Sequence, residues 1–255
     1  MRLKIDKQLV KDRFLNSVDT YDSNAIVQKN MAQELIRALI EKAGNNFDNI
    51  LEIGSGTGLL TKEIVEALDF EKLVTNDFSS DYNGIIKGIF TDINFNYEFI
   101  KGDAEFIFDF PENNNLIISN ATFQWFEDVI EFLNRMHNAL DDDGVIAFTT
   151  FGVDNFYEVN KIQKISLAYT SADEIIEKVS DNFELIFRHS SKEKLYFSSP
   201  IKVLQHIKNT GVNSIKSNAT IKPKKFISEY ENQFTSEKGV SLTYNPIYII
   251  LKKKS

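Results

Sequence analysis

The sequence contains no cysteine, and this absence removes several kinds of chemistry at once. A disulfide framework, a thiolate zinc site and a thiol nucleophile are all excluded. The chain has only three histidines, His137, His189 and His206, and they lie far apart in the sequence. We therefore expect no metal centre.

Long apolar segments are also missing. No run of 18 apolar residues occurs, and residues 1–10 mix charged and isolated apolar side chains, unlike the apolar core of a signal peptide. Hydrophobic residues nevertheless make up 42% of the 255 residues, which is enough for a full buried core. We expect a cytoplasmic protein without a membrane-spanning segment, built as one α/β domain with an addition.

Acidic residues exceed basic residues, and the formal net charge of −8 argues against general nucleic-acid binding. The charge is unevenly spread, because residues 201–255 hold ten lysines and three glutamates. That segment carries +7, which leaves −15 for residues 1–200. Two interpretations stay open: the segment contacts an acidic partner, or its lysines form a solvated face and a frayed tail.

Short apolar segments alternate with helix-length amphipathic segments between about residues 48 and 152. This alternation predicts a parallel sheet with helices on both faces. Before it we expect two helices, Lys7–Val18 and Ser23–Lys42, separated by a break at Thr20-Tyr21-Asp22. The expected strands are Asn49–Ile53, Lys72–Asn76, Tyr97–Lys101, Asn115–Ser119 and Val145–Thr150, and the helices between them are Leu59–Leu68, Ser80–Phe90 and Val129–Leu140.

The pattern loosens after residue 152. We expect a strand pair within Phe183–Phe197 and a terminal strand over Tyr244–Leu251 that inserts into the sheet. The helices expected in this part are Asn155–Ile165, Ala172–Val179, Pro200–Asn209 and Pro223–Phe234.

A glycine-rich turn follows the first expected strand. Glycines 54, 56 and 58 come after Ile53, at the carboxyl end of a parallel strand, where the backbone can approach a ligand closely. A dinucleotide-binding turn needs its third glycine at position 59, which is leucine, and a P-loop ends in Gly-Lys-Ser/Thr. The pattern acidic-x-G-x-G-x-G from Glu52 instead resembles the first motif of class I S-adenosylmethionine (SAM)-dependent methyltransferases. Plain turn chemistry is the alternative.

Acidic residues also end the next two strands. Asp77 lies about 20 residues beyond the turn, where a carboxylate can accept hydrogen bonds from ribose hydroxyls. The resemblance places at Asp103 an acid that accepts from the adenine amino group, followed by a backbone donor at Ala104, and it implies that Glu52 helps to hold the amino-acid part of SAM. Each acid alone would be an ordinary surface residue, but the ends of parallel strands converge on one crevice. The cofactor-binding residues expected are Glu52, Gly54, Ser55, Gly56, Asp77, Phe78, Asp103, Ala104, Asn120 and Ala121.

Other segments resemble one family within that class, the malonyl-acyl-carrier-protein O-methyltransferases of biotin biosynthesis, and the likeness covers nearly the whole chain. Ser119–Trp125 resembles the family pattern S-N-x-x-x-Q-W, and Phe148-Thr149-Thr150 resembles F-T-T. Phe14 and Tyr21 match its F-x6-Y segment, Leu204–Gly211 its L-x-x-L-K-x-T-G helix end, and Leu242-Thr243-Tyr244 its L-T-Y strand. The chain departs from the family at Asn16, where a basic residue is usual, and at Asp141–Gly144, where a Pro-x-Gly turn is usual.

The resemblance implies a Rossmann-like fold, with a seven-stranded, mostly parallel sheet covered by helices on both faces. It implies one methyltransferase domain made of an N-terminal helical cover (1–45), a SAM-binding core (46–152), and substrate-side helices with closing strands (153–255). The implied reaction moves a methyl group from SAM to the free carboxylate of a malonyl thioester, on acyl carrier protein or coenzyme A, for biotin synthesis. Because a carboxylate is ionised at neutral pH, no general base is required.

The residues expected near the transfer point are Tyr21 as a lid, Gln124 and Trp125 between cofactor and acceptor, and Phe151 in an acyl channel. Lys208 is expected to bind the substrate's charge or the phosphate of the carrier's phosphopantetheine arm. Packing is the alternative for Tyr21, Trp125 and Phe151, and an exposed helix end is the alternative for Lys208. Three other functions stay open: methylation of a small carboxylic acid or quinone precursor, SAM binding without turnover, and a nicotinamide-dependent dehydrogenase, which Leu59 disfavours.

Overall fold

The computed structural model describes residues 6–90, 95–163, 169–210 and 223–254, without the side chains of Phe14 and residues 16–19. The chain forms two compact units whose segments alternate along the sequence. The sheet unit comprises Ile26–Thr150, Ser171–His189 and Ile247–Ser255, and the helix-rich unit comprises Met1–Ala25, Phe151–Thr170 and Ser190–Pro246. The single domain in three parts stays a prediction.

The sheet unit is built on seven strands in the order β3-β2-β1-β4-β5-β10-β6. The pairs β1–β2, β2–β3, β1–β4 and β4–β5 are parallel. The predicted Rossmann-like sheet is therefore confirmed, and its strand order reverses between β1 and β4, where such sheets bind ligands. The strands are β1 (Asn49–Ile53), β2 (Lys72–Asp77), β3 (Asn96–Lys101), β4 (Asn114–Ser119), β5 (Leu140–Phe151), β6 (Phe183–Ser190) and β10 (Pro246–Lys253).

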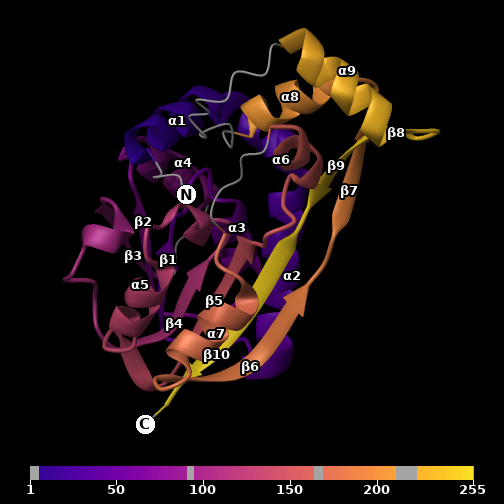
Figure 1. Cartoon of the computed structure of the whole chain (residues 1–255). Helices are drawn as coiled ribbons and strands as arrows, with labels where there is room; N and C mark the ends of the chain where they lie inside the picture. Colours follow the sequence, from indigo (N-terminus) through magenta and orange to yellow (C-terminus); the bar gives the residue numbers. More distant parts are fainter. Residues whose placement is uncertain (1–5, 91–94, 164–168, 211–222, 255) are drawn as a thin grey trace. The chain divides into compact units, whose positions relative to one another are not determined.

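Helices cover the sheet, and Figure 1 draws α5 and α7 in front of it and α2 behind it. Residues from both α5 and α7, such as Phe132 and Ile175, pack into one apolar core with strand residues such as Leu51 and Ile117. Such burial explains why β1 and β4 read as nearly continuous apolar runs. The helices of this unit are α2 (Ile26–Ala43), α3 (Leu59–Ala67), α4 (Asp81–Ile89), α5 (Val129–Met136) and α7 (Ala172–Val179), with short 3-10 turns η1 (Ala104–Phe106) and η2 (Phe123–Trp125).

The helix-rich unit combines helices with a small antiparallel sheet in the order β7-β9-β8. The buried carboxylate of Glu158 joins α6 to β9, because it accepts hydrogen bonds from Ser241 Oγ and from Thr243 N and Oγ1, each at 2.8 Å. None of the described helices in the chain is long and apolar enough to cross a membrane. The elements are α1 (Lys7–Asn24), α6 (Tyr157–Gln163), α8 (Pro200–Asn209), α9 (Pro223–Phe234), β7 (Glu193–Phe197), β8 (Thr235–Ser236) and β9 (Gly239–Tyr244).

The predicted break at Thr20-Tyr21-Asp22 is wrong. Helix α1 runs through it and ends at Asn24, and the N–H of Ala25 still donates to the carbonyl of Tyr21 at 2.7 Å. The segment has no glycine or proline to stop a helix, and polar residues alone do not interrupt one.

Three strand predictions also need correction. β5 begins at Leu140 rather than Val145, and its pairing with β4 shifts register between Asn114 and Leu116. The expected strand pair within 183–197 is two strands of different sheets, β6 and β7. The expected terminal strand is confirmed as β10, which lies between β5 and β6 in the seven-stranded sheet, but its first expected residue, Tyr244, belongs to β9 of the small sheet.

Candidate functional site

The glycine turn between β1 and α3 is attached to the end of β2. The N–H groups of Gly54 and Ser55 both donate to the carbonyl of Asn76, at 2.9 and 3.0 Å. Gly54 has φ +73°, and a Cβ there would overlap the side chain of Thr122. Gly56 has φ +50°, and a Cβ there would meet open space. Only glycine suits both positions, and the backbone at Gly56 is open to a ligand.

Asp77, the last residue of β2, holds this turn with its carboxylate. Its Oδ2 accepts from the N–H of Gly56 at 2.9 Å, and its Oδ1 accepts from the N–H of Ser79 at 3.3 Å. Its carbonyl accepts from the N–H of Gly102 at 2.9 Å, directly before Asp103. The convergence of the first three strand ends, expected from the parallel sheet, is therefore present.

Glu52 is completely buried one residue before the end of β1. Its Oε2 accepts from the Thr61 hydroxyl at 2.7 Å, whereas its Oε1 has no hydrogen-bond partner among the described residues. Burial raises the pKa of the Glu52 carboxyl to about 8; the Thr61 hydrogen bond lowers this pKa, and the Asp77 carboxylate raises it. Near neutral pH, the carboxyl is therefore largely protonated until a cation or donor reaches it.

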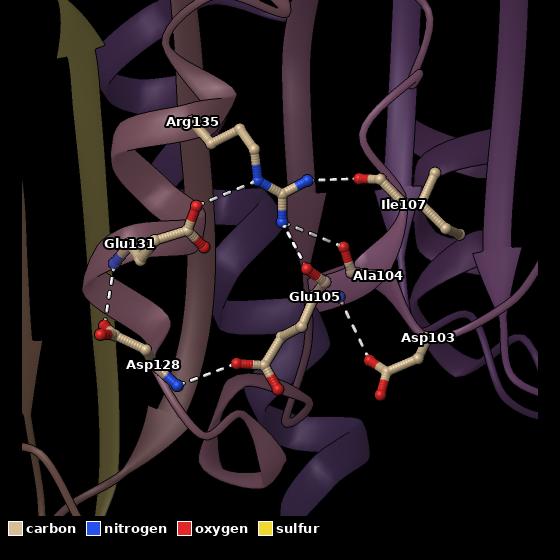
Figure 2. A network of polar contacts seen from close by, with 7 residues as sticks. All are labelled: Asp103, Ala104, Glu105, Ile107, Asp128, Glu131 and Arg135. Carbon is tan, nitrogen blue, oxygen red and sulfur yellow. Dashed lines mark hydrogen bonds and ion pairs between the residues drawn. The ribbon is translucent and has the colours of Figure 1, made fainter.

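The end of β3 leads into the short turn η1. Asp103 is half-buried, and its Oδ1 accepts from the N–H of Glu105 at 3.2 Å. Ala104, the first residue of η1, is buried. Figure 2 shows Asp103 at the edge of a polar network that reaches helix α5.

The two motifs that follow β4 and end β5 are hydrogen-bonded to each other. The Thr149 hydroxyl donates to Asn120 Oδ1 at 2.6 Å and accepts from the N–H of Ala121 at 2.9 Å. The Thr150 hydroxyl lies 3.5 Å from Gln124 Oε1, and Gln124 Nε2 donates to the carbonyl of Ala121 at 2.5 Å. The Ser-Asn…Gln-Trp and Phe-Thr-Thr segments therefore form one structural element.

Trp125 and Gln124 differ in surroundings. Trp125 is 4% exposed, which agrees with the packing alternative, whereas Gln124 is half-buried. Ala121 has φ +50°, a conformation that non-glycine residues rarely adopt and that is enriched at functional sites. The acceptor-side roles of Gln124 and Trp125 stay predictions.

The other three expected residues belong to the helix-rich unit. Tyr21 is half-buried on α1, and Lys208 is exposed near the end of α8. Phe151 is 3% exposed and its ring centre lies 5.9 Å from that of Tyr244, which favours packing. Within the two matched motifs, the Phe14 side chain and Gly211 lie outside the described residues.

Sequence reasoning missed several polar residues with distinctive surroundings. Gln28 on α2 is 2% exposed, its carbonyl accepts from Asn120 Nδ2 at 3.0 Å, and its Oε1 has no partner among the described residues. Arg13 on α1 has a buried Nη1 atom that is likewise without a partner there. Gln28 could have been noticed as a polar residue on the apolar side of helix 26–43. The sequence contains no comparable signal for Thr61 or Arg13.

The sheet unit offers hydrogen-bond acceptors of the kind that SAM requires. Buried polar atoms in proteins are nearly always paired, yet Glu52 Oε1, Ser55 Oγ and Gln28 Oε1 are not paired within the described chain. Carboxylate and amide oxygens suit the ammonium group of SAM, and Asp77 and Asp103 add acceptors at the next strand ends. The residues present therefore fit this cationic nucleoside.

Comparisons with known proteins agree with this geometry. A model of the family described as "Methyltransferase domain" matches residues 24–189. A solved structure with a similar fold is the N-methyltransferase NodS of Bradyrhizobium japonicum with S-adenosyl-l-homocysteine; its TM-score is 0.54 at 11% identity, over 92% of this chain and 99% of NodS. The sheet, the glycine turn and the acids at three strand ends define a class I SAM-dependent methyltransferase.

Two relatives place the chain within that class. Both are named malonyl-acyl-carrier-protein O-methyltransferase. The protein of Calditerrivibrio nitroreducens is 36% identical, over 95% of this chain and 96% of its own. The protein of Chlorobium luteolum is 37% identical, over 98% of this chain and 96% of its own. The chain belongs to the malonyl-acyl-carrier-protein O-methyltransferase family.

Proposed function

We propose that this chain transfers the methyl group of SAM to the free carboxylate of a malonyl group on acyl carrier protein, giving a methyl ester for biotin synthesis. The observation that supports this acceptor is the likeness to proteins of that name over nearly the whole chain. Esterification hides the carboxylate's charge, so that enzymes of acyl-chain extension can accept the product.

The cofactor contacts follow the order of the strand ends. Asp77 would accept from the ribose hydroxyls, with Phe78 beside it. Asp103 would accept from the adenine amino group, and the N–H of Ala104 would donate to the adenine ring. The residues proposed around the amino-acid part of SAM are Glu52, Gly54, Ser55, Gly56, Asn120 and Ala121.

Bound SAM supplies an electrophilic methyl group on a positively charged sulfur. Because the acceptor carboxylate is already ionised, the chain's residues need to align its oxygen with that methyl group and exclude water while the charges cancel. Gln124 and Trp125 would border the acceptor, and Tyr21 would donate a hydrogen bond near the transfer point. The bonds from Gln124 to Ala121 and Thr150 support its fixed orientation.

Two cationic side chains are candidates for binding the negatively charged groups of the acceptor substrate. Lys208 lies in a motif that resembles the family, and its exposure suits the phosphate of the carrier's phosphopantetheine arm. Arg13 is half-buried on α1, and its buried Nη1 atom has no hydrogen-bond partner among the described residues; a buried donor is costly until an acceptor reaches it. We therefore assign Arg13 to the malonyl carboxylate, which a planar guanidinium fits well.

The exposed face of α8 is the proposed docking surface for the acidic carrier protein. Ile201 and Leu204 are 50% and 38% exposed, and with Lys208 they follow the i, i+3, i+7 spacing of one helix face. The net charge of +7 over residues 201–255 would steer an acidic partner towards this segment. An exposed apolar pair with a basic residue suits such a partner.

The acceptor can be tested with the purified full chain and SAM labelled in its methyl group. Malonyl carrier protein, malonyl-CoA and small carboxylic acids are offered separately, with Asp77→Ala as the control for weak SAM binding. We expect transfer to malonyl carrier protein. Transfer only to a small acid or quinone precursor would contradict the malonyl acceptor, and SAM binding without transfer to any acceptor would indicate a non-catalytic protein.

A second test asks whether the reaction serves biotin synthesis. The chain is expressed in cells that lack their own malonyl methyltransferase and are grown without biotin. We expect growth with the chain and none with Asp77→Ala. Failure to restore growth by a chain that is active on malonyl carrier protein in vitro would contradict the biotin assignment while leaving the reaction intact.

A further inference from the structure

Helix α5 holds the turn after Asp103 at both of its own ends (Figure 2). At the start of the helix, the N–H groups of Glu127 and Asp128 donate to the two carboxylate oxygens of Glu105, at 2.9 and 2.8 Å. In the last turn of the helix, Arg135 donates to carbonyls of the same turn. One helix therefore fixes η1 through two separate sets of hydrogen bonds.

Arg135 contacts backbone carbonyls, one helix neighbour and two aromatic rings. Its Nη2 donates to the carbonyls of Glu105 at 2.8 Å and Ala104 at 3.4 Å, and its Nη1 donates to the carbonyl of Ile107. Its Nε faces Glu131 Oε1 at 3.4 Å, and the side chain is 15% exposed. Side chains on a helix lean towards its N-terminus, which lets a residue of the last turn reach η1.

Glu105 links Asp103 to helix α5 in this network. Its N–H donates to Asp103 Oδ1, its carbonyl accepts from Arg135, and its carboxylate accepts from the start of α5. A three-residue 3-10 turn leaves carbonyls without partners inside the turn, and Arg135 supplies donors for them. The orientation of the Asp103 carboxylate therefore depends on groups that lie outside the strand end.

We infer that Arg135 and Glu105 are positioning residues for the adenine end of the cofactor site. They set where the Asp103 carboxylate and the Ala104 N–H point, and thereby give the site its preference for adenine over bases without the 6-amino group. The inference rests on the proposed function, in which Asp103 accepts from that amino group. Neither positioning residue needs to touch the cofactor.

The test compares two ligands on the full chain by titration calorimetry. S-adenosylhomocysteine carries the 6-amino group, and S-inosylhomocysteine carries an oxygen in its place. A hydrogen bond to a charged acceptor is worth about 1.5–3 kcal/mol, so the natural chain should prefer the adenine ligand by about tenfold to a hundredfold. Arg135→Met keeps most of the apolar stem and removes the donors, and it should reduce this preference to about threefold.

Further variants separate positioning from general packing. Arg135→Lys keeps the charge but not the fork of donors, and it should restore only part of the preference. Glu105→Gln cannot accept two charge-assisted bonds and should act in the same direction as Arg135→Met. The matched control is Arg37→Met, because Arg37 is exposed and pairs with Glu34; it should leave both affinities unchanged.

The possible outcomes test the positioning role and the proposed contact between Asp103 and adenine separately. A general loss of packing would weaken both ligands equally and keep their ratio, which would overturn the inference. If Asp103→Ala removes the preference while Arg135→Met and Glu105→Gln keep it within about twofold, the positioning role is wrong. If Asp103→Ala itself keeps the preference, the proposed adenine contact is wrong. Thermal unfolding shows whether each variant is folded. If Arg135→Met does not fold, Glu105→Gln alone tests the positioning role.

Discussion

The two units differ in how completely their buried polar side chains are hydrogen-bonded. In the helix-rich unit most of those described are paired inside the unit. Glu158 accepts three hydrogen bonds, the Tyr230 hydroxyl donates to the carbonyl of Ser241 at 2.7 Å, and His206 Nε2 lies 2.8 Å from the Tyr244 hydroxyl. In the sheet unit, Glu52 near the end of β1 and Gln28 on α2 keep oxygen atoms without partners among the described residues.

We interpret the paired groups as structural and the unpaired groups as candidates for ligand binding. A buried group whose hydrogen bonds are made inside the chain contributes to stability, whereas an unpaired one costs stability until a ligand satisfies it. Arg13 is the described exception in the helix-rich unit. By the same criterion it is a candidate binding residue, which is the reason for proposing it as a ligand of the acceptor.

The largest effect is expected when a paired buried side chain of the helix-rich unit is removed. Glu158→Ala leaves Ser241 Oγ and the N–H and hydroxyl of Thr243 without their acceptor, so the free energy of unfolding should fall by about 4 kcal/mol. Denaturant unfolding measures this change, and calorimetry should show SAM affinity unchanged at temperatures where the variant is folded. A stability loss below about 1 kcal/mol would remove the distinction between the units.

The next prediction concerns Glu52 and pH. Its pKa of about 8 in the folded chain lies above the ordinary 4.5, so this group's stabilising contribution is complete below about pH 4.5 and is lost as the pH rises through about 8. Glu52→Gln has no such titration. Unfolding free energies measured between pH 5 and 8 should therefore show the natural chain losing about 3 kcal/mol relative to the variant.

The Glu52 carboxyl should also respond to the binding of SAM. Bound SAM brings positive charge, which lowers the pKa of Glu52, so binding near pH 7 should release a proton in the natural chain and not in Glu52→Gln. Calorimetry in buffers of different ionisation enthalpy measures this proton. Parallel pH profiles for the two chains, or equal proton release, would contradict the assignment of Glu52 to the cofactor side.

A slightly smaller effect is expected at Asp77. Asp77→Ala removes the proposed ribose acceptor and the bond to the Gly56 N–H, and should weaken SAM binding by about a hundredfold. Asp109→Ala is the matched control, since Asp109 is an exposed carboxylate. Equal affinities for the two variants in binding titrations would show that the acid at the second strand end is not a ligand.

The smallest effects concern the acceptor. Arg13→Met should raise the KM for malonyl carrier protein about tenfold and Lys208→Ala about threefold, with SAM affinity unchanged in both. The Lys208 effect is smaller because charge pairs at exposed positions are weak. Only the Lys208 effect should diminish at high salt. If Lys208→Ala affects SAM binding instead, the assignment of the acceptor's charges is wrong.

The sequence predicted those parts of the fold that depend on local pattern. The strands from Asn49 to Ser119 are confirmed to within one or two residues, because apolar runs and the glycine turn mark them directly. The break in α1 and the pairing of β6 with β7 were wrong. Pairing depends on which strands meet in space, and nothing near residues 183–197 records that β6 and β7 belong to different sheets.

The site was predictable to the same extent. Glu52, Asp77 and Asp103 could be proposed because they lie at or near the ends of consecutive strands. Thr61, Glu105 and Arg135, which surround them, could not be proposed, since each is recognisable only by the group it contacts in the fold. Arginine on an amphipathic helix ordinarily indicates a solvated face, and only the structure shows that Arg135 turns inward.

The pairing of Asn120 with Thr149 and of Gln124 with Thr150 has a consequence for how this enzyme can change. A substitution at one position leaves its partner with an unused hydroxyl or amide, so single changes are penalised even where a double change would be tolerated. New acceptor preferences should therefore arise in paired steps. Libraries that vary these positions jointly should recover active variants that one-at-a-time mutagenesis discards.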